Sequence, residues 1–305
     1  MSKFDELKER NTQVVLNISR ESDSDKIIML KKELYQNKLT MLELLTATNQ
    51  KVSKSARELR DEIKKKKPAI RYETGICDLD INLTDGYTQN GLEEGSMIML
   101  GGQSGAGKSE LLIRILSNIS KYSKVMFFNF EMGERRLNRK LSQFLKTDEQ
   151  LDNFIINSDS LKLNDLIMEI ELAAQDGIKF FAIDSKMKIK VDGAEAEYQK
   201  ISKISSTLHR TAIKNEIIIL LINQISEEDL KTGRLSFKGS GDQMYDTDMA
   251  WFVVINEDGS RKLICTKNRQ DEVLFNFILR KEAVPEKVYE QIPSQEPINV
   301  EMAIL

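Results

Sequence analysis

A glycine-rich stretch between an apolar strand and an amphipathic helix limits the folds that this chain can adopt. Residues 102–109 read GQSGAGKS and fit the pattern G-x-x-x-x-G-K-[ST]. The apolar run from Met97 to Leu100 predicts a strand before this stretch, and the run from Lys108 to Lys121 predicts a helix after it. Backbone N–H groups of such a loop surround a phosphate, and the positive end of the helix strengthens the attraction. The motif therefore predicts that the chain binds a nucleoside triphosphate.

The residues of this loop are expected to hold ATP and Mg²⁺ in different ways. The Lys108 ammonium is expected to reach the β- and γ-phosphates, and the Ser109 hydroxyl is expected to ligate Mg²⁺. The predicted nucleotide-binding residues are Gly102, Ser104, Gly105, Ala106, Gly107, Lys108, Ser109 and Glu110.

Two further apolar runs each end in an acidic residue. Residues 180–184, FFAID, place Asp184 at a strand end, where it is expected to hold Mg²⁺ through water. The next residue is Ser185, so no carboxylate follows Asp184 to activate the attacking water. Glu131, at the end of the run that starts at Val125, is the predicted general base. An acid at a strand end is also a common turn or helix-capping residue, and this is the alternative for Glu131.

After Pro68 the chain alternates short apolar runs with helical windows, which is typical of βαβ units and a mainly parallel sheet. The predicted strands besides Met97 to Leu100 are Val125 to Phe130, Phe180 to Asp184, Ile217 to Ile222, Trp251 to Ile255, Leu263 to Lys267 and Val273 to Phe277. The predicted helices besides Lys108 to Lys121 are Glu134 to Lys146, Asn164 to Ala174 and Glu195 to Lys214. The fold class is therefore α/β, with an ATPase domain over residues 68–282.

Residues 1–67 are expected to form a helical N-terminal region and a basic linker. Neither glycine nor proline occurs from Asp25 to Lys67, and apolar residues from Leu42 to Ile63 follow a heptad pattern. A helical hairpin explains this pattern as well as self-association does. Residues 51–71 hold nine Lys/Arg and three acidic residues, which favours either a solvated linker or a nucleic-acid contact. Residues 283–305 contain three prolines and are expected to form an extended tail.

Composition excludes several kinds of protein. Two cysteines without paired spacing and a single histidine, His209, argue against a disulfide framework, a zinc site or a Ser-His-Asp centre. A net charge of −3 means that any contact with a polyanion is local. The longest apolar run, Ile217 to Ile222, is too short to cross a bilayer, and the first ten residues, MSKFDELKER, lack the apolar stretch of a secretion signal. A cytoplasmic location is therefore expected.

Seven short motifs between residues 72 and 279 resemble, in order and spacing, the C-terminal motor domain of DnaB-type replicative helicases. These motifs are Thr74 to Asp80, Phe130 to Met132, Ile183 to Asp184, Ile201 to Ile213, Ile222 to Gln224, Ser240 to Asp248 and Cys265 to Arg269. The resemblance implies a RecA-like P-loop fold in which Glu131 is the catalytic base and Gln224 senses the γ-phosphate. It also implies that Lys267 and Arg269 enter the ATP site of a neighbouring subunit, so that hydrolysis needs a ring, expected to be a hexamer.

The chain departs from the family pattern at several positions. Gln270-Asp271 replaces the usual Asn-Gly, and Lys238-Gly239 replaces the usual Arg-Glu. About seventy helical residues replace the large primase-binding N-terminal domain of the family. A primase or a helicase loader remains an expected partner, but not through the usual surface.

Two loops that follow predicted strands are expected to bind single-stranded DNA. The first, Ser185 to Ala194, carries lysines at alternating positions: Lys186, Lys188 and Lys190. The second, Ser226 to Asp242, carries Lys231, Arg234, Lys238, Gly239 and Gly241. Plain solubilising charge is the alternative for these residues. Contacts of this kind follow the phosphate backbone and show little sequence preference.

The sequence thus indicates an ATP-dependent, ring-forming DNA helicase of small, phage- or plasmid-like size that translocates 5′ to 3′ on single-stranded DNA. A RecA-like recombinase, or a regulatory DNA-dependent ATPase that does not unwind DNA, is the alternative. A helicase loader of the AAA+ kind is a third reading, but its usual acidic pair is absent at Asp184-Ser185.

Overall fold

The central element of the structure is an eight-stranded sheet with the order β10-β9-β8-β3-β7-β6-β4-β5. The computed structural model describes residues 3–18, 20–46, 54–65, 70–84, 90–159, 161–191, 196–238 and 241–280, so the predicted tail at 283–305 lies outside it. The six strands from β8 to β5 in this order run parallel, and β9 and β10 complete the sheet in antiparallel pairs. The predicted α/β fold with a mainly parallel sheet is confirmed.

The predicted strands lie close to their expected places. Their bounds are Met97–Gly102 for β3, Val125–Asn129 for β4, Phe180–Asp184 for β6, Ile218–Ile222 for β7, Met249–Ile255 for β8, Arg261–Asn268 for β9 and Asn276–Leu279 for β10. The four predicted helices are α5 (Lys108–Ile119), α6 (Glu134–Phe144), α8 (Leu163–Gln175) and α9 (Glu197–Asn215).

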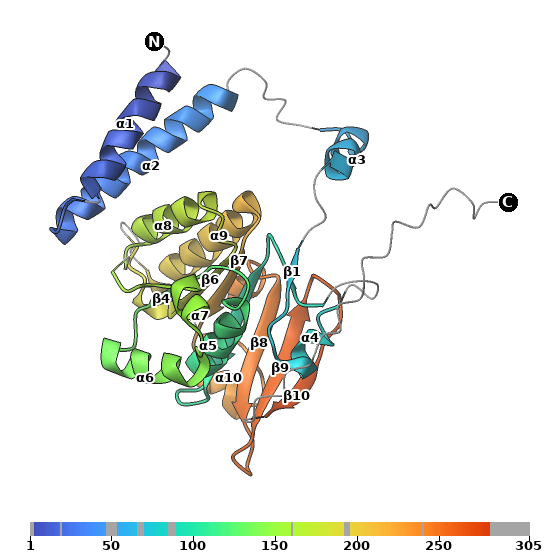
Figure 1. The fold of residues 1–305 in the computed structure, drawn as a ribbon. Coiled ribbons are helices and arrows are strands. Elements are labelled where there is room, and N and C mark those ends of the chain that lie inside the picture. The colour runs from blue at the N-terminus through green and yellow to red at the C-terminus, as the bar shows by residue number, and fades with distance from the viewer. Residues whose placement is uncertain are drawn as a thin grey trace.

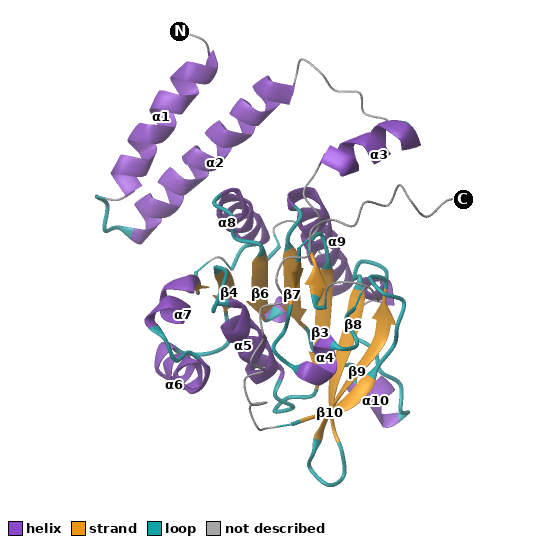
Figure 2. Cartoon of the chain, turned by 45° about the vertical axis from the view of Figure 1, so that its right-hand side comes forward, coloured by secondary structure: helices purple, strands orange, loops and turns teal. Residues whose placement is uncertain are grey.

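Apolar side chains cover both faces of the sheet, which explains why its strands are continuous apolar runs. In β3, Ile98 and Leu100 pack into one buried cluster, and Met97 and Met99 pack into another on the opposite face. The first cluster includes the apolar side of α5, and the second includes those of α8 and α9. Figure 2 shows α5 on one side of the sheet and α8 and α9 on the other.

Several short elements were not predicted. Strand β5 (Phe154–Asn157) pairs with β4 at the edge of the sheet, directly after α7 (Asp148–Asn153). Strands β1 (Arg71–Tyr72) and β2 (Leu92–Glu93) form a separate antiparallel pair, and α4 (Cys77–Asp80) lies between them along the chain. These elements have two to six residues, which is too few for a periodic pattern to identify.

The Thr74 to Asp80 motif forms a compact turn at the start of the α/β domain. The Thr74 backbone N–H and hydroxyl both donate to Asp80 Oδ1 at 2.7 Å, and the Gly75 N–H donates to Oδ2 at 3.0 Å. Burial raises the pKa of the Asp80 carboxyl to about 6, because its effect is larger than the opposite effect of the hydrogen bonds from Thr74 and Gly75. The motif therefore has a structural role, which is to fix the chain where it enters the domain.

The N-terminal region divides into three helices. A hairpin of α1 (Lys3–Ile18) and α2 (Ser24–Thr46) precedes α3 (Ala56–Lys65), with residues 47–53 outside the described residues (Figure 1). The predicted heptad seam does not form a buried stripe in α3, because Leu59 is 51% exposed and Ile63 is 59% exposed. None of the described helices is long and apolar enough to cross a membrane.

Ion pairs and a buried carboxylate attach the hairpin to α8. Lys31 Nζ lies 3.1 Å from Glu169 Oε1, and Lys32 Nζ lies 3.1 Å from Asp165 Oδ1. Glu171 is buried, accepts a hydrogen bond from the Tyr35 hydroxyl, and accepts another from Lys214 Nζ at 3.0 Å. The hairpin therefore docks on the α/β domain through α2.

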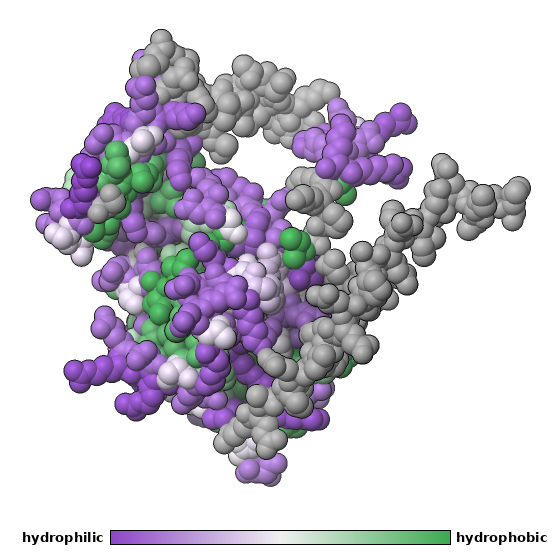
Figure 3. Space-filling model, in the orientation of Figure 1, coloured by the Kyte–Doolittle hydropathy of each residue, from purple (hydrophilic) through white to green (hydrophobic). Residues whose placement is uncertain are grey.

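This hairpin carries several exposed apolar side chains among mostly polar ones. Hydrophobic side chains gather over α1 and α2 in Figure 3, and the exposed apolar residues of these helices include Val15, Leu16 and Met29. Apolar surface of this kind is common where a protein contacts a partner.

We expect Glu171→Ala to weaken docking of the hairpin more than Asp165→Ala does. Hydrogen bonds to a buried charged group contribute about 1.5–3 kcal/mol each, whereas an exposed ion pair contributes at most about 1 kcal/mol. Urea unfolding and the rate of tryptic cleavage within α2 measure the difference. Equal effects of the two substitutions would show that the buried carboxylate does not hold the hairpin in place.

Candidate active site

The phosphate-binding loop connects β3 to α5 in the way that its motif predicts. Gly107 precedes α5 with a φ of +96°, a conformation that side chains other than glycine rarely adopt. At Gly102, an added Cβ would lie 2.7 Å from the carbonyl oxygen of Val253 on β8, so only glycine allows this close approach. Ala106 is buried, whereas Ser104 and Gly105 are exposed at the outer side of the loop.

The Lys108 side chain folds back over this loop. Its Nζ donates hydrogen bonds to the carbonyl oxygens of Gly102 at 2.7 Å and Gln103 at 2.8 Å. Burial lowers the pKa of Lys108, and the charges of Asp184 and Glu131 oppose this shift. Phosphate oxygens would replace the two carbonyls as acceptors when a nucleotide binds, with the ammonium already beside the loop.

Asp184 has the surroundings expected of a magnesium ligand. Its side chain is 1% exposed, and neither carboxylate oxygen has a hydrogen-bond partner among the residues that the structure describes. Burial raises the pKa of Asp184 to about 6, and the nearby Ser109 hydroxyl and Lys108 partly oppose this rise. A buried carboxylate without a donor, next to a hydroxyl, fits a hydrated Mg²⁺ that would be held by Asp184 and Ser109.

Glu131 follows β4, which lies next to β6, the strand that ends in Asp184. Asn129 is opposite Asp184 in the β4–β6 pair, and the Phe130 N–H donates to the Asp184 carbonyl at 2.7 Å. The Ser185 hydroxyl donates a hydrogen bond to Glu131 Oε1. The residue that takes the place of a second acid after Asp184 therefore orients the exposed carboxylate of Glu131.

Gln224 completes the group at this edge. It follows β7, which lies between β3 and β6, and its side chain is exposed. The carboxyl ends of parallel strands lie at the same end of a sheet. The phosphate loop with Lys108 therefore lies there, together with Asp184, Glu131 and Gln224. Glu110 lies in the first turn of α5, where its carboxylate is 3.8 Å from Lys140 Nζ and it lines a cavity beside Gly107.

Sequence reasoning missed Arg261, which also lies at this edge. A Cβ built on Gly107 would lie 3.2 Å from Arg261 Nε, a buried atom with no hydrogen-bond partner within the described part of the chain. A cavity of about 70 Å³ beside the loop is lined by Arg114, Phe144 and Arg280 as well as Arg261. No motif marks this arginine, because only the antiparallel return of β9 brings it to the phosphate loop.

Arg269 lies at the other end of the strands, where the parallel strands begin. Strand β9 runs antiparallel to β8, so Arg261 pairs with Ile255 at one end and Asn268 pairs with Met249 at the other. Eight residues of extended strand span roughly 26 Å, and Arg269 therefore cannot reach the phosphate loop of its own chain. Its side chain is exposed.

Lys267 is placed differently from the prediction. Its ammonium donates hydrogen bonds to the carbonyl oxygens of Met244 and Thr247, the second at 2.5 Å, instead of projecting beside Arg269. Burial lowers the pKa of Lys267, with a further decrease from the charge of Arg269. In this conformation Lys267 holds the segment before β8, because its carbonyls offer acceptors inside the same chain.

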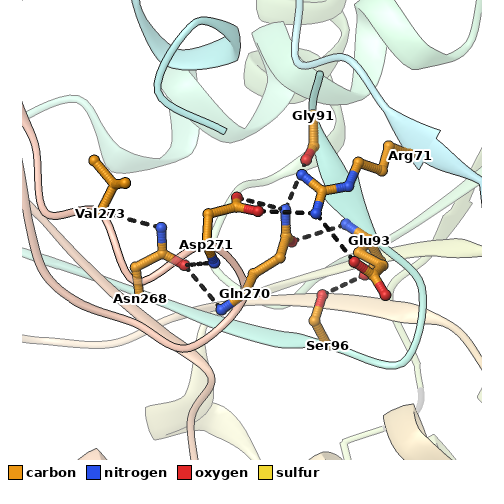
Figure 4. A network of polar contacts seen from close by, with 8 residues as sticks. All are labelled: Arg71, Gly91, Glu93, Ser96, Asn268, Gln270, Asp271 and Val273. Atoms are coloured by element: carbon orange, nitrogen blue, oxygen red, sulfur yellow. Dashed lines mark hydrogen bonds and ion pairs between the residues drawn. The ribbon is translucent and has the colours of Figure 1, made fainter. Parts of the chain in front are cut away.

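The two departures from the family pattern after Arg269 anchor its loop (Figure 4). Asp271 forms an ion pair with Arg71 at 2.8 Å, and the two side chains are 4% and 8% exposed. Gln270 accepts from the Glu93 N–H at 2.9 Å and donates to the Gly91 carbonyl at 2.9 Å. Gln270 and Asp271 therefore fix the loop that carries Arg269 to β1 and β2.

The residues predicted to bind DNA are exposed wherever the structure describes their side chains, with one exception. The exposed residues are Lys188, Lys190, Lys231, Arg234 and Lys238. Gly241 begins a short 3₁₀ helix, η2 (Gly241–Met244), and Gly239 lies outside the described residues. The loop from Ser226 also contains the unpredicted helix α10 (Glu227–Lys231).

Lys186 is the exception, contrary to the prediction from its alternating position. It lies in a 3₁₀ helix, η1 (Lys186–Lys188), and is 1% exposed. Burial lowers its pKa to about 7, and the charges of Asp246 and Glu197 oppose this shift. Lys186 faces the interior at the start of η1, whereas Lys188 and Lys190 remain exposed as predicted.

We expect Asp184→Asn to stabilise the nucleotide-free protein near neutral pH. Burial raises the pKa of Asp184 from 3.8 to about 6. The free energy of unfolding is therefore highest below about pH 4, where the carboxyl is protonated, and it falls as the pH rises to about 6 and the buried group becomes charged. Asparagine carries no charge, so the substitution should add up to about 3 kcal/mol above pH 6 and nothing below pH 4. Urea unfolding across this range measures the difference, with Asp176→Asn, an exposed position, as the control. A pH-independent effect would contradict the cost of burying this charge.

The chain has recognisable relatives among curated proteins, although no protein-family model matches it. It is 26% identical over 164 residues to the DNA repair protein RadA of Campylobacter jejuni, which covers 53% of this chain and 35% of that protein. It is 22% identical over 143 residues to the DNA repair protein RadA of Streptococcus pneumoniae, which covers 47% and 33%. The matches span about a third of the length of these relatives.

Solved structures share the fold. One solved ATPase domain has a TM-score of 0.57 at 16% identity, with 72% of this chain and 91% of that domain covered. A KaiC-like protein, PH0186 of Pyrococcus horikoshii, has 0.57 at 19% identity, covering 71% and 97%. A DnaB-like replicative helicase, studied with its interactions with primase, has 0.59 at 14% identity, covering 89% and 73%. The chain therefore has the RecA-like fold that its motifs predicted, and it shares this fold with these structures.

Proposed function

We propose that this protein is an ATP-dependent DNA helicase that works as a ring and translocates 5′ to 3′ on single-stranded DNA. The observation that carries the proposal is the division of charged groups between the two edges of the sheet. Lys108, Asp184, Glu131 and Gln224 lie at one edge, whereas Arg269 is exposed at the other. Arg269 therefore cannot reach the ATP site of its own chain, but a second copy of the chain could place its Arg269 there.

Within one subunit the proposed roles follow from the contacts. Lys108 neutralises the β- and γ-phosphates, and Asp184 and Ser109 hold Mg²⁺, which would stabilise charge on the phosphates. Glu131, oriented by the Ser185 hydroxyl, accepts the proton of the attacking water. Gln224 follows the strand between the phosphate loop and Asp184, where it would contact the γ-phosphate.

Between subunits the proposed role of Arg269 is to neutralise charge in the transition state of the neighbouring site. Its anchored loop fixes its direction, and Lys267 supports the adjoining segment from within the same chain. A hexameric ring is the assembly that the resemblance implies. The exposed apolar side chains of the α1–α2 hairpin are the contacts that we assign to a neighbouring subunit, a primase or a helicase loader.

DNA is proposed to bind the exposed cations of the two loops. The bases of these loops lie together, because Lys186 in the first contacts Gln243 at the end of the second. Phosphate contacts from such flexible side chains would follow the strand with little sequence preference. Action on DNA inside the cell also implies the cytoplasmic location that the sequence predicted.

A recombinase or a regulatory DNA-dependent ATPase is the second candidate function. The similarity to the DNA repair protein RadA over about half of the chain favours it. Both candidates use the same ATP site, so hydrolysis alone does not separate them.

Unwinding of a forked duplex separates the two candidates. With ATP and Mg²⁺, we expect the purified protein to separate a fork that carries a 5′ single-stranded tail, and not a duplex with only a 3′ tail. Lys108→Ala should lose this activity, because the phosphates lose their main side-chain cation. A gel assay of strand release measures the result. Hydrolysis that single-stranded DNA stimulates without any unwinding would instead support the recombinase or regulatory ATPase.

A mixture of Arg269→Ala and Glu131→Gln protomers should regain hydrolysis that neither variant has alone. In rings assembled at random from equal amounts, about a quarter of the interfaces combine an intact Glu131 with an intact Arg269 from the neighbour. Steady-state ATP hydrolysis across mixing ratios measures this. Mixing Glu131→Gln with the double variant is the control, and it should restore nothing. Mixed rings that form but stay inactive would argue against an arginine shared between subunits.

A further inference from the structure

A buried lysine connects the strand that carries Asp184 to the second DNA loop. Lys186 follows Asp184 by two residues, and its Nζ donates to Ser205 Oγ on α9 at 2.8 Å. The same Nζ donates to Gln243 Oε1 in η2 at 2.5 Å. Ser205 and Gln243 are fully buried, and Lys186 is nearly so. The contact therefore lies inside the domain, away from solvent and from DNA.

The amide of Gln243 joins two further segments to this lysine. Its Oε1 also accepts a hydrogen bond from Asn223 Nδ2 at 2.6 Å, at the end of β7. Its Nε2 donates to the carbonyl oxygen of Lys238 at 3.1 Å. A single side chain therefore connects the strand ends of the ATP site to the loop residue proposed to bind DNA.

A second connection runs through the backbone beside the first. The Lys238 N–H donates to the Gln224 carbonyl at 2.8 Å, and the Gln224 N–H donates to Asn223 Oδ1 at 2.9 Å. Ile225 and Phe237 form the next bridge of this small antiparallel pair. The base of the second loop is thus attached to Gln224 directly and to the Asp184 strand through Lys186 and Gln243.

The contact of Lys186 with Gln243 resists separation. A buried donor that loses its acceptor costs about 1–3 kcal/mol, and more when it is charged. If η1 shifts when Mg²⁺ and nucleotide occupy the site, the lowest-energy response is for Gln243 to move with Lys186. Gln243 in turn holds the Lys238 carbonyl, so the loop follows.

Stability alone does not explain why polar groups occupy this place. Well-packed apolar side chains of similar volume often replace a buried charge without loss of stability. A network of buried hydrogen bonds differs because its donors and acceptors meet in only one relative placement of its segments. The cluster of Lys186, Ser205, Asn223 and Gln243 is therefore suited to hold the strand ends of the proposed ATP site and the second loop in a defined arrangement.

We infer that Lys186 is a positioning residue that couples the nucleotide site to the second loop, so that the affinity for single-stranded DNA depends on the bound nucleotide. Lys186 touches neither ligand and acts through Gln243 on the Lys238 segment. The inference rests on the proposed function, because it assumes that the second loop binds DNA.

The test compares DNA affinity with and without nucleotide in Lys186→Met. Fluorescence anisotropy with a labelled oligonucleotide gives the dissociation constant in the absence of nucleotide and with a non-hydrolysable ATP analogue and Mg²⁺. Couplings of ordinary size change affinity about 5- to 150-fold. The variant should reduce this change by a factor of about three or more, while the backbone connection between Gln224 and Lys238 keeps the rest. Its affinity for the analogue alone and its urea unfolding midpoint should match the wild type. Lys203→Met, which removes an exposed positive charge from α9, should keep the full change.

A second pair of variants covers the case in which Lys186→Met fails to fold. Gln243→Leu removes the same contact from the other side, and in the double variant the two apolar side chains can pack on each other. Gln243→Leu also removes the contacts with Asn223 and the Lys238 carbonyl. The double variant should therefore be no more uncoupled than Gln243→Leu alone, because that change already breaks the Lys186 connection. A DNA affinity that still responds fully to nucleotide in these folded variants would overturn the inference and leave the proposed function intact. A wild-type protein that binds no DNA in either state would overturn the proposed function, and the inference with it.

Discussion

Parallel pairing of four strands is the constraint on which the rest of this structure depends. Strands β3, β7, β6 and β4 are neighbours in the sheet, and each leaves its carboxyl end at the same edge. Their backbone hydrogen bonds and the buried clusters on both faces prevent any strand from shifting against the next. Lys108, Asp184, Glu131 and Gln224 are therefore brought together by the register of the sheet and not by contacts among themselves.

Antiparallel β9 adds a second consequence of strand direction. Because it returns along β8, its first residue, Arg261, lies beside the phosphate loop, and Arg269, just beyond its end, lies at the far edge. The two arginines at the two ends of β9 therefore lie at opposite ends of the parallel strands. The ion pair of Arg71 with Asp271 ties the loop of Arg269 to the chain entry, which is in turn fixed by the turn of Thr74 and Asp80. The position of Arg269 is therefore set by residues distant in sequence.

Polar groups inside the domain are concentrated where the ATP edge meets the loops. The interior around Asn223 and Gln243 is otherwise lined by apolar residues such as Met99 and Phe237. Burying amides and an ammonium there is tolerated because they satisfy one another. Asp184 lies two residues before Lys186, and its carboxylate oxygens accept no hydrogen bond from the residues that the structure describes, so they remain available to a metal ion. The hydrogen-bonded side chains of Lys186, Asn223 and Gln243 thus form a structural part of this region, and the carboxylate of Asp184 belongs to the part proposed to bind a ligand.

The sequence by itself determined the fold class, the phosphate loop and the strand ends that carry Asp184, Glu131 and Gln224. Each depends on local patterns, namely apolar runs, a glycine spacing and the residue that ends a strand. Only the tertiary structure decided that Lys186 is buried, that Lys267 turns inward and that Arg261 reaches the phosphate loop. Spacing along a chain does not show which side of a turn faces the core or which end of an antiparallel strand meets a distant loop. Those outcomes depend on contacts between segments that lie 20 to more than 150 residues apart, such as Lys186 with Gln243 and Gly107 with Arg261.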